Sequence, residues 1–219
     1  MFNVIRGDDV PPSLAERVSW SGSDVIQKLR EIFHDKCYIC ETKEPLSLNV
    51  EHFDAHQGDI EKKYKWDNLF YACGRCNNLK RHLFNNLINC TDPGIDALRL
   101  IRHAPPLTPF SRCVVIEAMD EDPKTIRTAE LIRKVFNEDD TGNKEVTGAY
   151  LRKRVYKKYA KLLSYLNVYI DEESLDSHKE DAIAHIKQLM SKTQEYSAFL
   201  RWAVMESPEL LDVVRGSID

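Results

Sequence analysis

The sequence predicts an α+β protein in which a small unit of two strands and a helix precedes a mostly helical region. Four of the six cysteines form two CxxC pairs, Cys37 with Cys40 and Cys73 with Cys76. Short apolar runs lie between these pairs, whereas apolar residues at helical spacing dominate the second half of the chain. With 219 residues, of which 42% are hydrophobic, the chain is long enough to bury a core.

Three parts are expected along the chain. Residues 1–36 form a lead-in and a helix, residues 37–92 form a module that contains both cysteine pairs (the cysteine module), and residues 93–219 are mostly helical. Turn-forming residues at 89–96 and 104–109 mark the end of the cysteine module.

Composition excludes several classes of protein. No apolar run reaches the roughly 18 residues that a membrane helix needs, and the first residues carry charges where a signal peptide is apolar. We therefore expect a cytoplasmic protein that does not enter the membrane. The formal net charge of -4 excludes a protein that is basic throughout, so any surface for nucleic acid must be a local patch.

The first expected helix follows the Pro-containing lead-in. Ser23 is a good N-cap residue, and Val25, Leu29 and Ile32 lie on one face of a helix that ends near His34. This helix leads directly to the first cysteine pair.

Between the cysteine pairs, the pattern predicts a strand, a loop and a second strand or turn. Apolar alternation around Leu46, Leu48 and Val50 indicates the first strand, and the polar residues 54–65 indicate the loop. The segment WDNLFYAC at 66–73 follows, and its Trp, Leu and Phe are expected to form the small core of the module.

Helices are expected in the rest of the chain, with one strand among them. Leu79, Leu83 and Leu87 predict a helix over 77–87, which completes the order strand, strand, helix. A strand is expected at 113–118. Further helices are expected at 123–137, 148–166, 177–190 and 193–205, with a short one after residue 208.

The two CxxC pairs predict a structural zinc site. Two thiolates in such a pair can bind the same tetrahedral ion, and two pairs supply the four sulfurs of a closed site. In a reducing cytosol zinc is favoured over disulfides, and over the alternative of buried thiols or a redox pair. Cys90 and Cys113 stand alone and are expected to be plain core or surface thiols.

Residues beside the cysteine pairs suit hydrolysis of a phosphodiester. This reaction needs a base for water and a hard cation to stabilise charge on the phosphate. His52 is a candidate base, and Glu51 and Asn77 offer oxygen ligands that suit Mg²⁺. Lys80 is expected to meet a phosphate as a point charge.

At these residues the sequence resembles the HNH, or ββα-metal, nuclease family. The resemblance is carried by CYIC, by VEH at 50–52, by WDNL at 66–69 and by ACGRCNNLK at 72–80. It implies that His52 is the general base, that Glu51 and Asn77 bind a catalytic Mg²⁺ or Mn²⁺, and that Asn68 orients the intervening loop. Glu51 stands where the family more often has aspartate.

The whole chain is most similar to HNH nucleases of bacterial anti-phage defence, the Septu-type subunits that also occur in retrons. VEHF, the TDP at 91–93 and the helix KTIRTAELIRKVFN at 124–137 carry this similarity. It implies a partner ABC-type ATPase and, in retrons, a reverse transcriptase with its RNA-linked DNA. The chain has no GxxxxGK[ST] motif of its own, so residues 93–219 are expected to provide a docking and substrate surface.

Two further histidines are weaker candidates. His56 follows His52 by four residues in the expected loop, and His82 lies on the expected helix after the second pair. For both, a solvated histidine is the favoured interpretation.

A basic tract covers residues 144–161. Lys144, Arg152, Lys153, Arg154, Lys157, Lys158 and Lys161 are accompanied by a single acidic residue, Glu145. A solvated helix face and a nucleic-acid surface are equally compatible with this pattern.

Two other functions remain open at this point. A catalytically silent zinc module that binds nucleic acid or protein would explain the cysteines but not Glu51, His52 and Asn77. An effector that cleaves RNA, for example tRNA, would use the same metal site, since the chemistry of water, base and metal is common to DNA and RNA.

Overall fold

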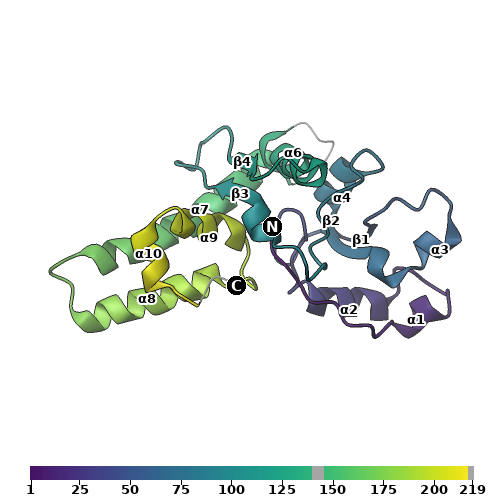
Figure 1. Cartoon of the computed structure of the whole chain (residues 1–219), viewed down its shortest axis with the longest axis horizontal. Coiled ribbons are helices and arrows are strands. Elements are labelled where there is room, and N and C mark those ends of the chain that lie inside the picture. The colour runs from purple at the N-terminus through teal and green to yellow at the C-terminus, as the bar shows by residue number, and fades with distance from the viewer. Residues whose placement is uncertain (140–145, 217–219) are drawn as a thin grey trace.

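A computed structural model of the chain, which describes residues 1–139 and 146–216, has the predicted α+β class (Figure 1). Its two sheets are small and antiparallel, one pairing β1 (Leu48–His52) with β2 (Leu69–Cys73) and the other β3 (Ile101–Ala104) with β4 (Val115–Ala118). The helices of the first half are α1 (Pro12–Ala15), α2 (Ser23–Ile32), α3 (Ile60–Lys63), the 3-10 helix η1 (Trp66–Asn68), α4 (Gly74–Lys80) and α5 (Ala97–Leu100). Those of the second half are α6 (Pro123–Asn137), α7 (Gly148–Ile170), α8 (Asp176–Met190), α9 (Ser197–Met205) and α10 (Pro208–Val213).

The β1–β2 pair has two chemically different ends. Leu48 lies opposite Cys73 at one end, and His52 lies opposite Leu69 at the other. All five residues of β2 are buried, and Phe33 at the end of α2 packs on Phe70 with 5.5 Å between ring centroids. The strand therefore fixes the cysteine end and the His52 end of the module relative to each other.

Several predicted boundaries in the first half were wrong by a few residues. β1 begins at Leu48, because Leu46 continues the alternation but is 78% exposed. The N-cap of α2 is Gly22, and Ser23 is the first helical residue. The predicted loop 54–65 contains the short helix α3, capped by the Asp59 side chain.

The helix after the second cysteine pair is shorter than predicted. α4 already begins at Gly74 inside that pair, and it ends at Lys80, because Arg81 has a positive φ of 42°. The Leu83 amide then donates to the Lys80 carbonyl in a turn, and the Leu83 side chain is 56% exposed. The apolar spacing predicted a helix through residue 87, but only part of that spacing is used for packing.

The helical region was predicted more accurately than the short strands. α6 has the predicted bounds, whereas α7 extends to Ile170 and α9 begins at Ser197, after Tyr196 in a left-handed conformation. β3 and α5 were not predicted, since four-residue elements give no clear periodicity. Of the described helices, none is both long and apolar enough to cross a membrane.

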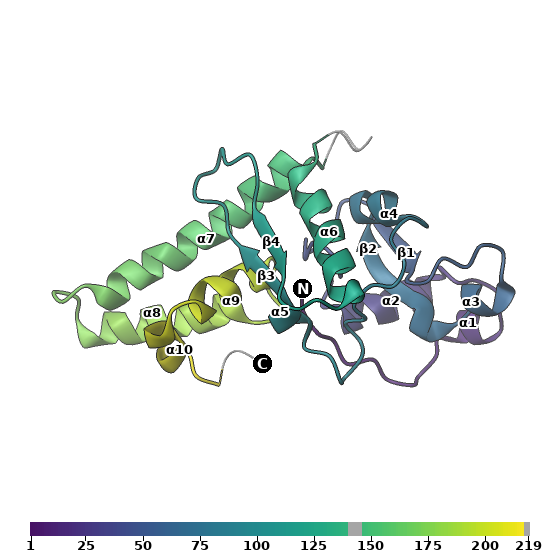
Figure 2. The same ribbon diagram turned by 45° about the horizontal axis from the view of Figure 1, so that its top comes forward.

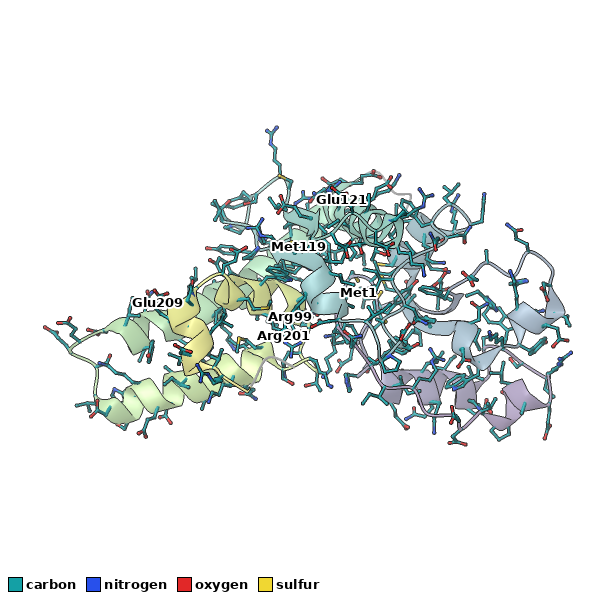
Figure 3. All side chains as sticks on the ribbon, in the orientation of Figure 1. Met1, Arg99, Met119, Glu121, Arg201 and Glu209 are labelled. Carbon is teal, nitrogen blue, oxygen red and sulfur yellow. The ribbon has the colours of Figure 1, made fainter. Side chains whose placement is uncertain are left out.

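The main core joins the cysteine module to the helical region. It runs from Met1 and the residues around both cysteine pairs to α6, the start of α7, and Phe199. Met1 is buried at this junction (Figure 3), and its amine lies 3.1 Å from His103 Nε2 and 3.3 Å from a Glu41 carboxylate oxygen. A second core holds α7, α8, α9 and α10 together, and the α7–α8 pair extends away from the β1–β2 pair (Figure 2).

Candidate active site and metal centre

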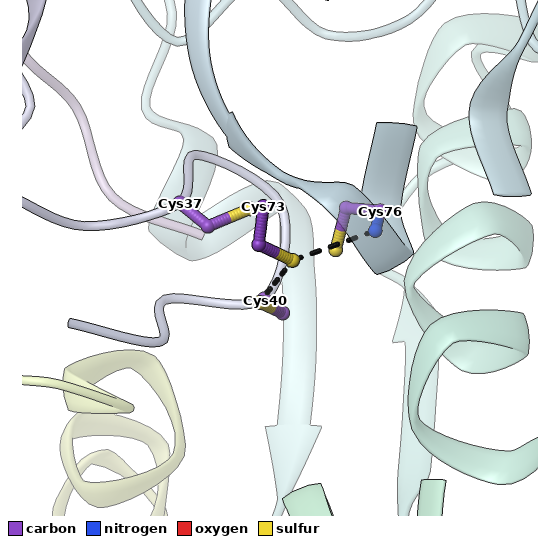
Figure 4. Close-up of side chains that lie close together, drawn as sticks. All are labelled: Cys37, Cys40, Cys73 and Cys76. Carbon is purple, nitrogen blue, oxygen red and sulfur yellow. Dashed lines mark hydrogen bonds between the residues drawn. The ribbon is translucent and has the colours of Figure 1, made fainter. Parts of the chain in front are cut away.

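The four paired cysteines form one buried cluster (Figure 4). Their sulfur atoms all lie within 4.8 Å of one another, and the Sγ atoms of Cys40 and Cys73 are 3.7 Å apart. Tetrahedral zinc with Zn–S bonds of about 2.3 Å separates its sulfurs by about 3.8 Å. The cluster can therefore hold a metal such as zinc, as the spacing predicted.

Local structure explains how the second pair is presented. Cys73 ends β2 and caps α4, since its Sγ accepts a hydrogen bond from the Cys76 amide at 3.4 Å. Burial raises the pKa of the Cys37 and Cys76 thiols, because a buried thiolate loses its hydration. A divalent cation would supply the charge that stabilises the thiolates. The other two cysteines agree with expectation, Cys90 being buried and Cys113 exposed.

His52 lies at the end of β1, half-buried between two rings. Its ring centroid is 4.8 Å from that of Trp20 and 4.6 Å from that of His56. Its Nε2 lies 3.0 Å from the Lys63 carbonyl oxygen, which can only accept a hydrogen bond. Nε2 therefore carries the hydrogen, and Nδ1 of the neutral ring has the free lone pair.

The environment of His52 favours the neutral ring. Burial lowers the pKa of His52, and the nearby His56 and lysines act in the same direction, whereas the hydrogen bond to Lys63 opposes them. A neutral imidazole with a free Nδ1 is the form that a general base requires.

Asn68 joins both sides of the loop that follows β1. Its Oδ1 accepts from the Asp54 amide at 2.7 Å, and its Nδ2 donates to the carbonyls of Asp54 and Lys62, both at 2.9 Å. Lys62 precedes Lys63, whose carbonyl meets His52. The Asn68 side chain therefore holds the backbone at Asp54 and at Lys62 together.

Lys80 does not take the position that the sequence suggested. It is fully buried, and its ammonium donates to Glu51 Oε1 at 2.6 Å, to the His52 carbonyl at 3.1 Å and to the Phe53 carbonyl at 2.8 Å. These bonds use all three of its N–H groups, so none is left for a phosphate. The predicted phosphate contact was therefore wrong. Lys80 has a structural role instead, since it links the end of β1 to α4.

Glu51 shares this buried cluster. Its Oε2 accepts from the Tyr38 hydroxyl at 2.8 Å, and its side chain is 4% exposed. Burial raises the pKa of Glu51, although the bonds to Lys80 and Tyr38 oppose this. Tyr38 lies within the first cysteine pair, and nothing in the sequence indicated its contact with Glu51.

The sequence predicted two oxygen donors for a second cation, the Glu51 carboxylate and the Asn77 amide. Asn77 is half-buried on α4 directly after Cys76, and none of the hydrogen bonds found in the described residues involves its side-chain amide. A carboxylate oxygen can accept more than one bond, so Glu51 and Asn77 both offer oxygen donors of the kind that Mg²⁺ prefers. Apart from the four cysteines, the described residues contain no cluster of three or more His, Cys or acidic side chains placed to bind a metal.

Other residues of the site were not indicated by the sequence. Trp20 precedes α2 and contacts the His52 ring in a tilted arrangement, and the Lys63 carbonyl selects the tautomer of His52. Neither feature belongs to a motif, since a backbone carbonyl and a lone aromatic give no sequence signal. His56, expected to be solvated, contacts His52, whereas His82 is exposed as expected.

Replacing Lys80 by methionine is expected to lower the free energy of unfolding by about 3–5 kcal/mol, because Glu51 would be left as an unpaired buried carboxylate. Denaturant unfolding measures the loss. The double variant Lys80→Met with Glu51→Gln removes that charge and should recover part of the loss, which a double-mutant cycle quantifies. Unchanged stability of Lys80→Met would contradict the structural role.

Comparison of the chain with models of known protein families and with curated proteins found no match.

Proposed function

We propose that the chain is an HNH endonuclease that uses a divalent metal ion to hydrolyse phosphodiester bonds of nucleic acid. One observation carries the proposal: β1 ends in a half-buried histidine whose Nε2 is engaged by a backbone carbonyl, directly after the buried Glu51 carboxylate, which pairs with Lys80 on the same helix as the Asn77 amide. A buried cysteine cluster at the other end of the same strand pair positions α4, which carries the amide.

In this mechanism His52 removes a proton from water through Nδ1. The resulting oxygen attacks the phosphorus in line, and the P–O bond on the opposite side breaks. The Lys63 carbonyl stabilises the imidazolium that forms, because it already accepts the Nε2–H. Asn68 keeps this carbonyl in place through its bond to the neighbouring Lys62.

Glu51 and Asn77 are the residues that would hold Mg²⁺ or Mn²⁺. The cation, when bound, neutralises charge on the phosphate and on the leaving oxygen. Lys80 and Tyr38 hold the Glu51 carboxylate in one orientation, which limits the rearrangement that metal binding requires. The four cysteines would hold a structural Zn²⁺.

A cleavage assay on matched DNA and RNA pools tests the proposal. With Mg²⁺ or Mn²⁺ the zinc-loaded chain should cut one or both pools, and brief treatment with EDTA should stop cleavage while metal analysis still finds zinc. Cleavage of RNA alone would favour the RNA-cleaving alternative at the same site. No cleavage of either pool, alone or with its partner, would favour the silent zinc module that binds nucleic acid or protein.

The resemblance to Septu-type and retron subunits supports a second part of the proposal. The chain would act in the cytoplasm, in an anti-phage complex with an ABC-type ATPase and, in a retron, with a reverse transcriptase and its RNA-linked DNA. Co-expression with such an ATPase should yield a stable complex whose cleavage depends on nucleotide. Full activity of the lone chain, with no complex formed, would contradict this part.

A further inference from the structure

The structure divides the basic tract of 144–161 into residues with different tasks. Arg152 is buried, and its guanidinium donates to the Phe136 carbonyl at 2.7 Å and to the Ser111 carbonyl at 2.9 Å. Arg154 and Lys158 form ion pairs with Glu195 at 2.5 and 3.3 Å. Lys144 and Glu145 lie outside the described residues.

Three lysines of α7 remain on its solvent face. Lys153, Lys157 and Lys161 are exposed and follow one another at intervals of four residues, opposite the buried Leu151, Val155 and Leu162. Within the described parts of the chain none of the three has an ion-pair partner. We call these residues the lysine ridge. By itself the ridge is compatible with an ordinary solvated face.

The loop that joins β3 to β4 adds aromatic and basic groups to one end of the ridge. Phe110 is 85% exposed and Leu107 is 83% exposed, and Arg112 is exposed without an ion pair among the described residues. Figure 2 shows this loop beside the first part of α7. A hollow of about 340 Å³ lies between them, lined by Phe110, Arg112, Tyr150 and Lys153 among others.

The backbone on both sides of Phe110 is held by the fold. Pro105, Pro106 and Pro109 restrict the loop, and the Phe110 amide donates to the Thr108 hydroxyl at 3.3 Å. Arg152 ties the loop to α7 through the Ser111 carbonyl, directly after Phe110. Leu107 and Phe110 are both more than four-fifths exposed in the same short loop, so together they offer an apolar surface beside the cations.

We propose that the lysine ridge and the β3–β4 loop form a binding surface for single-stranded nucleic acid. Lysines at regular intervals suit the phosphates of an extended strand, and exposed aromatic rings suit unpaired bases, which stack on them. A duplex hides its bases and would use only the ridge. The inference rests on the proposed nuclease function in one respect. It names the class of substrate, a single strand, that this surface would hold outside the catalytic residues.

Asp139 is an acidic residue near the start of α7, but its charge does not counteract that of the lysine ridge. Asp139 accepts from the Ala149 amide at 2.7 Å and pairs with Arg152 at 3.4 Å. Its charge is therefore directed to buried and backbone groups and not to the ridge.

Binding of a labelled single-stranded oligonucleotide, measured by fluorescence anisotropy, tests the proposal. The full chain with His52→Ala is used, so that the probe stays intact. Replacing Lys153, Lys157 and Lys161 by glutamine should weaken binding about 30- to 100-fold at about 0.1 M salt, with a difference that closes as salt rises, because each phosphate contact contributes a salt slope of about 0.7. Replacing Lys124, Lys179 and Lys187 by glutamine changes the net charge equally and should have little effect.

Phe110→Ala separates stacking from charge. It should weaken binding of the single strand about tenfold, leave the salt slope unchanged, and have no effect on a duplex of the same sequence. Equal losses in both triple variants, or an unchanged affinity of the ridge variant, would overturn the proposal. So would equally tight binding of a labelled polyglutamate peptide together with no effect of Phe110→Ala, which would indicate an acidic protein partner.

The binding experiment and the cleavage assay can fail independently of each other. If the parent chain cuts nothing but the ridge variant loses binding, the nuclease function fails and the surface stands. If the parent chain cuts nucleic acid and the ridge variant binds as tightly as the parent, the surface fails alone.

Discussion

Replacing His52 by alanine is expected to lower the rate of phosphodiester cleavage about 10²- to 10⁴-fold, the usual loss when a general base is removed. The neutral ring, with its Nε2–H held by the Lys63 carbonyl, is the group that accepts the proton of water at Nδ1. Alanine offers no such atom. The proposed metal ligands Glu51 and Asn77 are unchanged, so metal dependence should persist at the lower rate.

Two measurements distinguish loss of a base from loss of structure. Alanine removes the bond to the Lys63 carbonyl and the contacts with Trp20 and His56, which should lower the free energy of unfolding by only about 1–3 kcal/mol. Zinc content should stay the same. Added imidazole should restore part of the rate, because it can supply the missing base in the space left by the ring.

His178→Ala is the matched control. His178 is exposed at the start of α8, far along the chain from the site, and its replacement should leave cleavage within twofold of the parent. Cleavage at the parent rate by folded, zinc-loaded His52→Ala would refute the mechanism and favour the silent zinc module.

The sequence predicted those parts of the site in which spacing determines geometry. Two CxxC pairs bring four sulfurs together whatever the intervening fold, and a residue next to such a pair, such as Asn77, is carried with it. Periodicity was also sufficient for α6, whose capping Asp122 and first-turn Pro123 mark its start clearly.

The direction of a long side chain was not predictable. The positive charge of Lys80 suits a phosphate, but whether its ammonium points to solvent depends on the acceptors around it. Glu51 and two backbone carbonyls of β1 and its exit supply those acceptors, and no pattern in the sequence records a carbonyl. The tasks of the basic tract were unpredictable for the same reason, because Glu195, which pairs with Arg154 and Lys158, lies far from them in the sequence.

Replacing Cys73 by serine is expected to abolish the bound zinc and to lower the melting temperature by roughly 10–20 °C. Structural zinc contributes directly to the free energy of folding, and loss of more than about 5 kcal/mol shifts the transition of a chain of this size by that amount. Cys73 is chosen from the four cysteines because it also ends β2 and caps α4. Metal analysis and thermal unfolding measure the two changes.

Two other cysteines provide matched controls for that substitution. Cys90→Ser places a hydroxyl in the same core without touching the cluster, so it should lower stability by only about 1–3 kcal/mol and keep one zinc per chain. Cys113→Ser, at an exposed position, should change neither quantity. A Cys73→Ser protein that keeps its zinc, or that melts within two degrees of the parent, would remove the zinc site from the account of the fold.

A comparison of Cys73→Ser with His52→Ala tests whether the reaction depends on the cysteine cluster. Asn77 lies on the helix that Cys73 caps, so Cys73→Ser should abolish cleavage as well as zinc binding, and excess Mn²⁺ should not restore it. His52→Ala should lower the rate of cleavage and keep zinc, because β1 is held at its other end by the pairing of Leu48 with Cys73. The dependence therefore runs in one direction, from the metal cluster to the reaction, and retention of cleavage in a zinc-free Cys73→Ser chain would contradict it.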